Sequence, residues 1–297
     1  MKIDRALFKK VAALRLTTPH LARGPRQGNR RSPNLGRGVE FADYRPYSPG
    51  DDLRLVDWNV YARLEVVLVR LFHEDLNMAV HVAVDASGSM DFGEVNKADH
   101  AAQLGAALAL VAMFNQDTVS LGCIGGRGPK AVVRGQNENG FPAVLKLLER
   151  VEPAERAEPW RELEAQLHGR TVDRLFFLSD MLYEDDDRER ILRLLASASS
   201  GSVLLHVLSE EELDPDLSDA QLITDAETGQ ELLIAGGDRA AETYQRGLRG
   251  WLDKLQERCQ RLGIQYVPAH THVAVDRLLL GVMRQAGVAE SATGEVR

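Results

Sequence analysis

From residue 78 onward, short apolar runs alternate with longer segments of helical periodicity, and this alternation constrains the fold most strongly. The apolar runs predict strands at 78–85, 118–124, 172–179, 202–208 and 264–268, with a short edge strand at 131–134 and a hairpin at 221–234. Helical periodicity predicts helices at 95–115, 139–150, 159–168, 187–198, 239–262 and 273–285. Strands that alternate with helices form parallel sheets. We therefore predict an α/β fold over residues 76–297, with an open, mostly parallel, Rossmann-like sheet and helices on both faces.

The first 75 residues have a different pattern, which indicates a separate unit. Leu7, Val11 and Leu14 recur at helical spacing and predict a helix near residues 4–15. Alternating apolar residues at 38–47 and an apolar run at 65–72 predict two strands. We therefore expect residues 1–75 to comprise this helix, a basic loop and a small β-rich extension.

The charge of the chain is unevenly distributed. Residues 1–50 contain eleven Lys or Arg and three Asp or Glu, whereas the whole chain has a formal net charge of −8. The basic stretch at 23–37 is rich in Gly and Pro, which predicts a surface loop. Clustered arginines neutralise phosphates, so nucleic-acid binding is one alternative. No aromatic residue lies within the stretch for base stacking, and we favour a solvated or partner-docking loop.

The composition predicts a cytoplasmic protein without a membrane span. The chain contains no apolar run long enough to cross a bilayer, and its N-terminus lacks the pattern of a signal peptide. Its two cysteines, Cys123 and Cys259, lie in apolar segments and are expected to be small core residues. These features together favour a reducing compartment.

Oxygen-bearing side chains follow the predicted strand at 78–85. Asp85 ends the strand, and Ser87 and Ser89 follow at alternate positions. Carboxylate and hydroxyl oxygens suit a hard divalent cation such as Mg²⁺. No His or Lys follows closely enough to be an obvious activator of either serine, so the run is a poor nucleophile site. We predict a metal site.

Asp180 ends the predicted strand at 172–179 in the same way. Parallel strands have their carboxyl ends at one edge of the sheet, where such folds bind ligands, so Asp180 is expected to join Asp85, Ser87 and Ser89. Capping is the alternative, since Asp and Ser are common at helix N-termini. For Asp180 the two interpretations fit equally well. For the Asp-x-Ser-x-Ser run we favour metal, because three oxygen ligands exceed what a cap needs.

The Asp-x-Ser-x-Ser run after an apolar strand resembles the metal-ion-dependent adhesion site of von Willebrand factor A domains. Over nearly its whole length, the chain also resembles the domain-of-unknown-function 58 family of bacterial proteins, and in particular those relatives that lack membrane-spanning helices. The matching segments are 38–52, 56–63, 85–90, 225–230 and 261–267.

This resemblance implies a von Willebrand factor A-like fold and a non-enzymatic role. It implies an adaptor or co-chaperone that works with a MoxR-type AAA+ ATPase and uses bound Mg²⁺, or another divalent cation, to bind a protein carboxylate. The usual threonine ligand of such sites is missing, because residues 152–160 contain no Thr or Ser. Glu155 or Glu158 is a candidate substitute, although a surface glutamate is the simpler interpretation.

A metal-dependent hydrolase is the enzymatic alternative. The sequence contains neither a Gly-x-x-x-x-Gly-Lys-Ser/Thr phosphate loop nor a His-Glu-x-x-His motif. His270 and His272 form the only close histidine pair, and alternation at a strand end explains this pair about as well as metal ligation does. We therefore expect a binding protein and no catalytic residues.

Overall fold

The computed structural model describes residues 1–2, 8, 40–73, 78–129, 132–135, 137–154, 158–218, 221–224, 231–234 and 237–285. Contacts divide the chain into two compact units, one of Met1–Arg23 with Met78–Arg297 and the other of Gly24–Asn77. The predicted division into domains at 1–75 and 76–297 stays a prediction.

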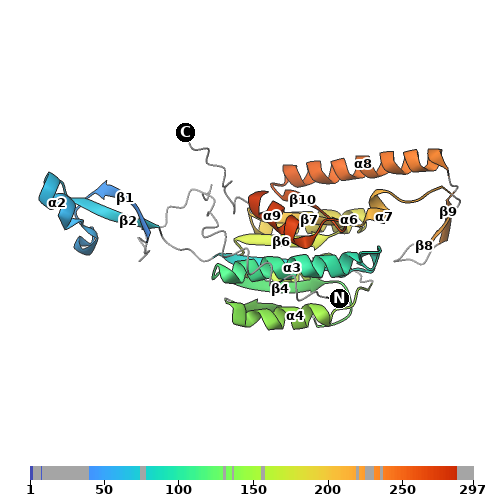
Figure 1. The fold of residues 1–297 in the computed structure, drawn as a ribbon, viewed down its shortest axis with the longest axis horizontal. Coiled ribbons are helices and arrows are strands. Elements are labelled where there is room, and N and C mark those ends of the chain that lie inside the picture. Colours follow the sequence, from blue (N-terminus) through green and yellow to red (C-terminus); the bar gives the residue numbers. More distant parts are fainter. Residues whose placement is uncertain are drawn as a thin grey trace. The chain divides into compact units, whose positions relative to one another are not determined.

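A six-stranded sheet forms the centre of the larger unit (Figure 1). Its strands lie in the order β10-β7-β6-β3-β4-β5. All neighbours are parallel except the edge strand β5, which pairs antiparallel with β4. The predicted mixed α/β fold with a mostly parallel sheet is confirmed. The strands are β3 (Ala79–Asp85), β4 (Thr118–Ile124), β5 (Val133–Gly135), β6 (Arg174–Ser179), β7 (Ser202–Leu208) and β10 (Gln265–His270).

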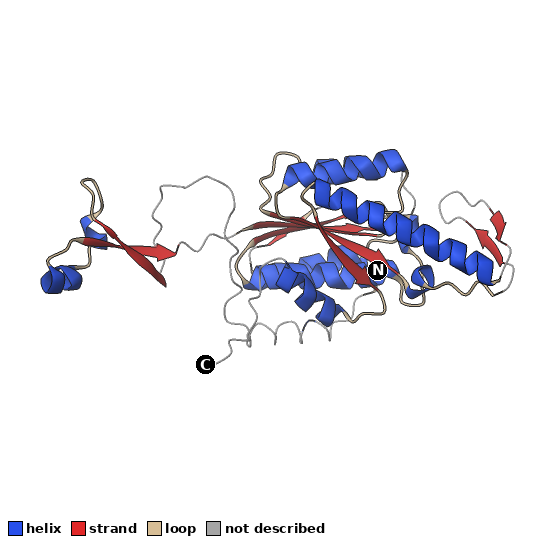
Figure 2. Cartoon of the chain, turned by 90° about the horizontal axis from the view of Figure 1, so that it is seen from above, coloured by secondary structure: helices blue, strands red, loops and turns tan. Residues whose placement is uncertain are grey.

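Helices cover both faces of this sheet, as Figure 2 shows. One face packs against α3 (Lys97–Phe114), α4 (Phe141–Glu149) and α9 (Val275–Gln285). The other face packs against α5 (Pro159–Leu167), α6 (Asp185–Ala198) and α8 (Asp238–Arg261). The short helix α7 (Glu210–Leu213) follows β7 and has a capping box at Ser209. The larger unit is thus a three-layer α/β structure with one apolar core on each side of the sheet.

Helix α3 is the most deeply buried helix of the described residues, because it is apolar around most of its circumference. Fourteen of its eighteen residues are buried. Gly105 lets the helix approach β3 closely, since a Cβ atom at this position would lie 2.8 Å from Cγ2 of Val84. The helix begins at Lys97, and the Asn96 side chain accepts a hydrogen bond from the Asp99 N–H as its N-cap.

The smaller unit contains a two-stranded antiparallel sheet, as the alternating sequence pattern predicts. The sheet is formed by β1 (Glu40–Pro46) and β2 (Leu68–His73), with a 3-10 turn η1 (Leu53–Leu55) and a helix α2 (Trp58–Leu64) between them. Asp57 caps α2 and also accepts a hydrogen bond of 2.8 Å from the Tyr44 hydroxyl. Local hydrogen bonds therefore hold this connection in place.

Several predicted features lie outside the described residues. The basic stretch at 23–37 lies entirely outside them, and the predicted helix at 4–15 does so except for Phe8, whose ring packs edge-on against Phe141 in the larger unit. The predicted hairpin is confirmed as β8 (Gln221–Thr224) paired antiparallel with β9 (Glu231–Ile234). Cys123 and Cys259 are both buried and free, as expected. Within the described residues, no helix combines the length and apolar character that a membrane span requires.

Candidate functional site

Asp85 and Asp180 lie at the same edge of the sheet because β3 and β6 are paired neighbours. Val84 of β3 pairs with Leu178 of β6, so the last residues of the two strands come side by side. Asp85 ends β3, and Asp180 directly follows β6. The side chains of both residues are fully buried. The carboxyl edge of the sheet thus holds two carboxylates within one small region.

Asp85 accepts hydrogen bonds from three groups. Its Oδ1 accepts from the Ser87 N–H at 2.8 Å, and its Oδ2 accepts from the Ser179 hydroxyl at 2.7 Å and the Tyr183 hydroxyl at 2.5 Å. Burial, together with the nearby charge of Asp180, raises the pKa of Asp85 to about 6 in spite of these donors. The site therefore has an excess of buried negative charge, which a cation would relieve.

Ser87 and Ser89 lie on the turn that follows Asp85. The 3-10 turn η2 (Gly88–Met90) brings their hydroxyl oxygens to 3.0 Å from each other. Ser87 is buried, and its backbone lies close to the next loop, since a Cβ atom on Gly125 would be 3.1 Å from the Ser87 nitrogen. Two hydroxyl oxygens thus follow the Asp85 carboxylate along a tightly packed turn.

Asp180 is paired with a lysine of α3. The Lys97 ammonium donates to Asp180 Oδ2 at 2.7 Å and to Glu212 Oε1 at 2.5 Å. Asp180 Oδ1 accepts from the Leu182 N–H at 3.1 Å, and the Asp180 carbonyl accepts from the His206 ring at 2.9 Å. Asp180 therefore connects the end of β6 to α3 and, through Lys97, to α7.

Asp85, Ser87 and Asp180 do not cap the helices that follow their strands, as the capping alternative would require. Asn96 caps α3, so neither Asp85 nor Ser87 performs that role. Helix α6 begins at Asp185 and has no side-chain cap, so Asp180 does not cap it either. Asp85 and Asp180 instead each accept from the N–H two residues later, within the loops that follow their strands.

The structure brings the sequence-predicted residues together and adds others that the sequence did not indicate. Ser179, Tyr183, Lys97, Glu212 and His206 all bond directly to Asp85, Asp180 or Lys97. The sequence gives one weak indication of a role for Lys97, which is a charged residue near the start of an otherwise apolar helix. No sequence pattern indicates a role for Tyr183 or Glu212, because their roles depend on contacts between distant segments.

The oxygen donors fit a small divalent cation. An ionised carboxylate offers about four acceptor positions, so Asp85 has about one left after its three hydrogen bonds and Asp180 about two. No group of three or more His, Cys, Asp and Glu side chains within the described residues is arranged to hold a metal, so a cation at this position would need the serine hydroxyls as additional ligands. Oxygen-only donors are the ligands that Mg²⁺ prefers. Asp85, Ser87, Ser89 and Asp180 are thus chemically suited to hold it.

Residues 152–154, which begin the segment where the resemblance to von Willebrand factor A sites leads one to expect a threonine, lie beside the motif. The Ala154 N–H donates to the Ala86 carbonyl at 3.0 Å, which brings residues 152–154 against the Asp-x-Ser-x-Ser backbone. Glu155 lies outside the described residues. Glu158 is exposed and forms an ion pair with Arg161 at 2.8 Å, so it is a surface residue. No replacement for the threonine is identified among the described residues of this loop.

Exposed apolar side chains come from the two loops that carry the oxygen donors. Phe92 and Val95 follow Ser89 and are 48% and 50% exposed, and Leu182 follows Asp180 and is 41% exposed. The Phe92 ring lies near the cluster, because its centroid is 5.7 Å from the Lys97 ammonium. Three exposed apolar side chains thus belong to the loops that follow the oxygen donors.

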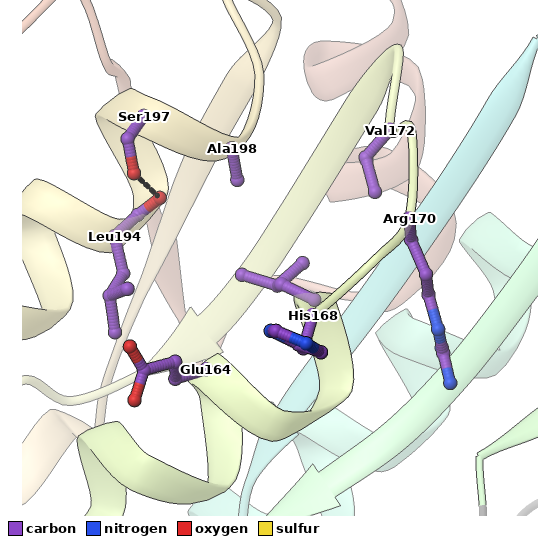
Figure 3. Close-up of a pocket in the computed structure, with 8 residues that line it drawn as sticks. Glu164, His168, Arg170, Val172, Leu194, Ser197 and Ala198 are labelled. Atoms are coloured by element: carbon purple, nitrogen blue, oxygen red, sulfur yellow. Dashed lines mark hydrogen bonds between the residues drawn. The ribbon is translucent and has the colours of Figure 1, made fainter.

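A separate cavity of about 190 Å³ lies near the amino ends of the strands, away from the oxygen cluster at their carboxyl ends (Figure 3). It is formed near the C-terminal ends of α5 and α6 and the amino end of β6, and Glu164, His168 and Arg170 supply its charged or ionisable groups. The Ser197 hydroxyl beside it donates to the Leu194 carbonyl at 3.1 Å. This cavity is therefore distinct from the oxygen cluster.

The family described as "Protein of unknown function DUF58" matches residues 43–250 of the chain. The uncharacterized proteins Rv1480 of Mycobacterium tuberculosis and Mb1516 of Mycobacterium bovis are each 34% identical over 110 residues. That segment is 36% of this chain and 35% of each relative, so the chain matches about a third of their length.

Two solved structures from Bacteroides are also similar to this chain. The conserved hypothetical protein BatB from Bacteroides thetaiotaomicron is 14% identical with a TM-score of 0.39, over 70% of this chain and 100% of that one. An aerotolerance-related membrane protein from Bacteroides fragilis is 13% identical with a TM-score of 0.39, over 71% of this chain and 98% of that one.

Proposed function

Because this chain belongs to the DUF58 family, we propose that it is a non-enzymatic protein-binding module with a von Willebrand factor A-like, metal-dependent site. In this proposal Asp85, Ser87, Ser89 and Asp180 hold Mg²⁺ or a similar divalent cation. The cation takes a carboxylate from a partner protein as a further ligand. The single observation that carries the proposal is the position of these four oxygen-bearing residues at the carboxyl ends of the paired strands β3 and β6.

The chain's own residues would prepare the site for a cation. Ser179 and Tyr183 hold the Asp85 carboxylate in a fixed orientation, and the turn at Gly88–Met90 places the two hydroxyls beside each other. Mg²⁺ takes oxygen ligands, and a carboxylate of a partner protein would be a suitable further oxygen ligand beside the two carboxylates and two hydroxyls of this chain. The exposed side chains of Phe92, Val95 and Leu182 support protein binding, because the loops that follow the oxygen donors thereby offer apolar contact in addition to the ionic bond.

The partner that we propose is a MoxR-type AAA+ ATPase, with the chain as its adaptor or co-chaperone in the cytoplasm. This assignment rests on the family resemblance. The geometry of the site supports an acidic side chain as the group that the partner contributes. An acidic side chain of the ATPase would then complete the coordination of the cation.

Affinity capture of the tagged full chain from native lysate, in Mg²⁺ or in EDTA, tests this proposal. The informative variant is Asp85→Asn, which keeps the size of the side chain. Asp85→Ala would leave the Ser179 and Tyr183 hydroxyls without their acceptor and would perturb the fold. Asp117→Asn is the matched control, because Asp117 is also buried but accepts from Met78 at the opposite end of β3.

We expect mass spectrometry to identify an AAA+ ATPase with the wild-type chain and with Asp117→Asn in Mg²⁺, but not in EDTA or with Asp85→Asn. Capture of the ATPase irrespective of metal and of Asp85 would keep the adaptor role and eliminate the metal bridge. If no AAA+ ATPase is captured under any condition, the proposed partner is wrong.

A further inference from the structure

Lys97 is a buried cation inside the candidate metal site. Its side chain is completely inaccessible to solvent, as is that of Asp180, and the side chain of Glu212 is only 16% exposed. Its ammonium lies 2.7 Å from Asp180 Oδ2 and 2.5 Å from Glu212 Oε1. The candidate site therefore already contains one positive charge, which belongs to the protein.

Burial of a lysine ammonium is unfavourable unless carboxylates compensate for its lost hydration. The two carboxylates do so here, because each of them accepts a hydrogen bond from the ammonium. Lys97 is therefore a fixed cation, and a divalent ion that also contacts Asp180 must bind beside it.

We infer that Lys97 competes with the divalent cation for Asp180 and thereby keeps the cation affinity of the site low until a partner carboxylate arrives. This inference rests on the proposed function and concerns the regulation of the same site. Two cations that share one carboxylate repel each other strongly in a buried environment. A partner carboxylate adds negative charge next to the divalent cation and offsets this repulsion, so cation and partner bind together.

Glu212 makes this competition possible without leaving the ammonium unpaired. When Asp180 turns toward the divalent cation, Lys97 keeps its second acceptor on α7. Glu212 itself is held by the capping box at Ser209, and its carbonyl accepts from the Tyr244 hydroxyl of α8 at 2.7 Å. The second acceptor is therefore fixed in position.

Calorimetric titration of the full chain with Mn²⁺, a divalent cation that also prefers oxygen ligands and stands in for Mg²⁺, tests the inference. Lys97→Met removes the ammonium and retains most of the apolar volume. We expect it to bind Mn²⁺ at least about tenfold more tightly than the wild type, since the competing charge is gone. Lys146→Met on the exposed surface of α4 changes the net charge equally and should leave the affinity unchanged.

Circular dichroism establishes that each variant is folded. If Lys97→Met alone does not fold, the variant that combines Lys97→Met with Glu212→Gln removes a positive and a negative charge together and should show the same tighter binding. Equal or weaker Mn²⁺ binding by a folded variant without the ammonium would overturn the inference while leaving the metal site in place. If neither the wild type nor Lys97→Met binds Mn²⁺, or if Asp85→Asn binds it as well as the wild type, the proposed function fails as well.

Discussion

Tyr183 is one of the residues that fix the orientation of Asp85. Its hydroxyl donates to Asp85 Oδ2 at 2.5 Å, and the Ser179 hydroxyl donates to the same oxygen. Hydrogen bonds to an ionised carboxylate are stronger than those between neutral groups. They also favour the charged form of Asp85, whose pKa burial and Asp180 raise. Tyr183 thus contributes both to stability and to a carboxylate that is ready to bind a cation.

Tyr183→Phe should lower the free energy of unfolding by about 1.5–3 kcal/mol at pH 7, because the variant loses a hydrogen bond to a charged group. Tyr244→Phe is the matched control, since the Tyr244 hydroxyl donates to a neutral backbone carbonyl and the side chain is 37% exposed. We expect that control to lose only about 0.5–1.5 kcal/mol. Urea denaturation measures both values. A loss for Tyr183→Phe no greater than that for the control would show that the bond to Asp85 is weak.

At the scale of elements, the contact between α3 and β3 decides where Lys97 lies. Helix α3 packs against the face of the sheet that contains Val82 and Val84, and Gly105 allows the close approach. Lys97 begins this helix, so the distance between helix and strand determines where its ammonium can reach. A change in packing at Gly105 would therefore affect both the core and the position of Lys97.

Gly105→Ala should destabilise the protein although alanine favours helix. Its Cβ would lie 2.8 Å from Val84 Cγ2 and 3.5 Å from Val82 Cγ1. Such overpacking lowers the free energy of unfolding by about 1–3 kcal/mol, whereas the higher helix propensity of alanine raises it by about 1 kcal/mol.

Gly247→Ala in α8 is the control, because nothing lies within 4 Å of its added Cβ. This variant should gain about 0.5–1 kcal/mol from helix propensity. Thermal unfolding compares the two variants. Stabilisation by both substitutions would contradict the close contact between α3 and β3.

At the scale of the whole molecule, buried histidines determine the response to acid. His81, His100 and His206 are all buried, and burial lowers the pKa of each to about 4. As the pH falls below about 6.5, these histidines therefore bind protons in the unfolded chain before they do so in the folded chain. Their contribution to stability is thus lost between about pH 6.5 and pH 4. Asp85 has the opposite effect on stability. Its pKa is raised to about 6 in the folded chain, so the folded chain binds a proton at Asp85 at a higher pH than the unfolded chain does, which favours folding as the pH falls.

The three histidines outweigh the single carboxyl group, so the free energy of unfolding should fall by several kcal/mol from pH 7 to pH 5, about 2 kcal/mol for each histidine. Urea denaturation at both pH values, with EDTA present, measures this loss. His81→Gln should reduce the loss by about 2 kcal/mol, since it removes one of the titrating groups. A free energy that is equal at the two pH values would contradict the burial of these histidines.

Much of the fold was predictable from the sequence because its elements depend on local patterns. The apolar run at 118–124 coincides with β4, and the run at 202–208 coincides with β7. The periodic segment at 159–168 became α5 at Pro159–Leu167. Hydrophobic periodicity is set within a few turns of chain, so it can be read without knowledge of distant residues.

For the candidate site, the sequence alone determined which oxygen-bearing residues end which strands, namely Asp85 after β3 and Asp180 after β6. Only the tertiary structure decided that these strands are neighbours, that Tyr183 bonds to Asp85 98 positions away, and that Lys97 bonds to Asp180 83 positions away. The physical reason is that strand order and the burial of charge arise from long-range packing. A lysine in a helical segment has the same local pattern whether it lies in solvent or between two buried carboxylates.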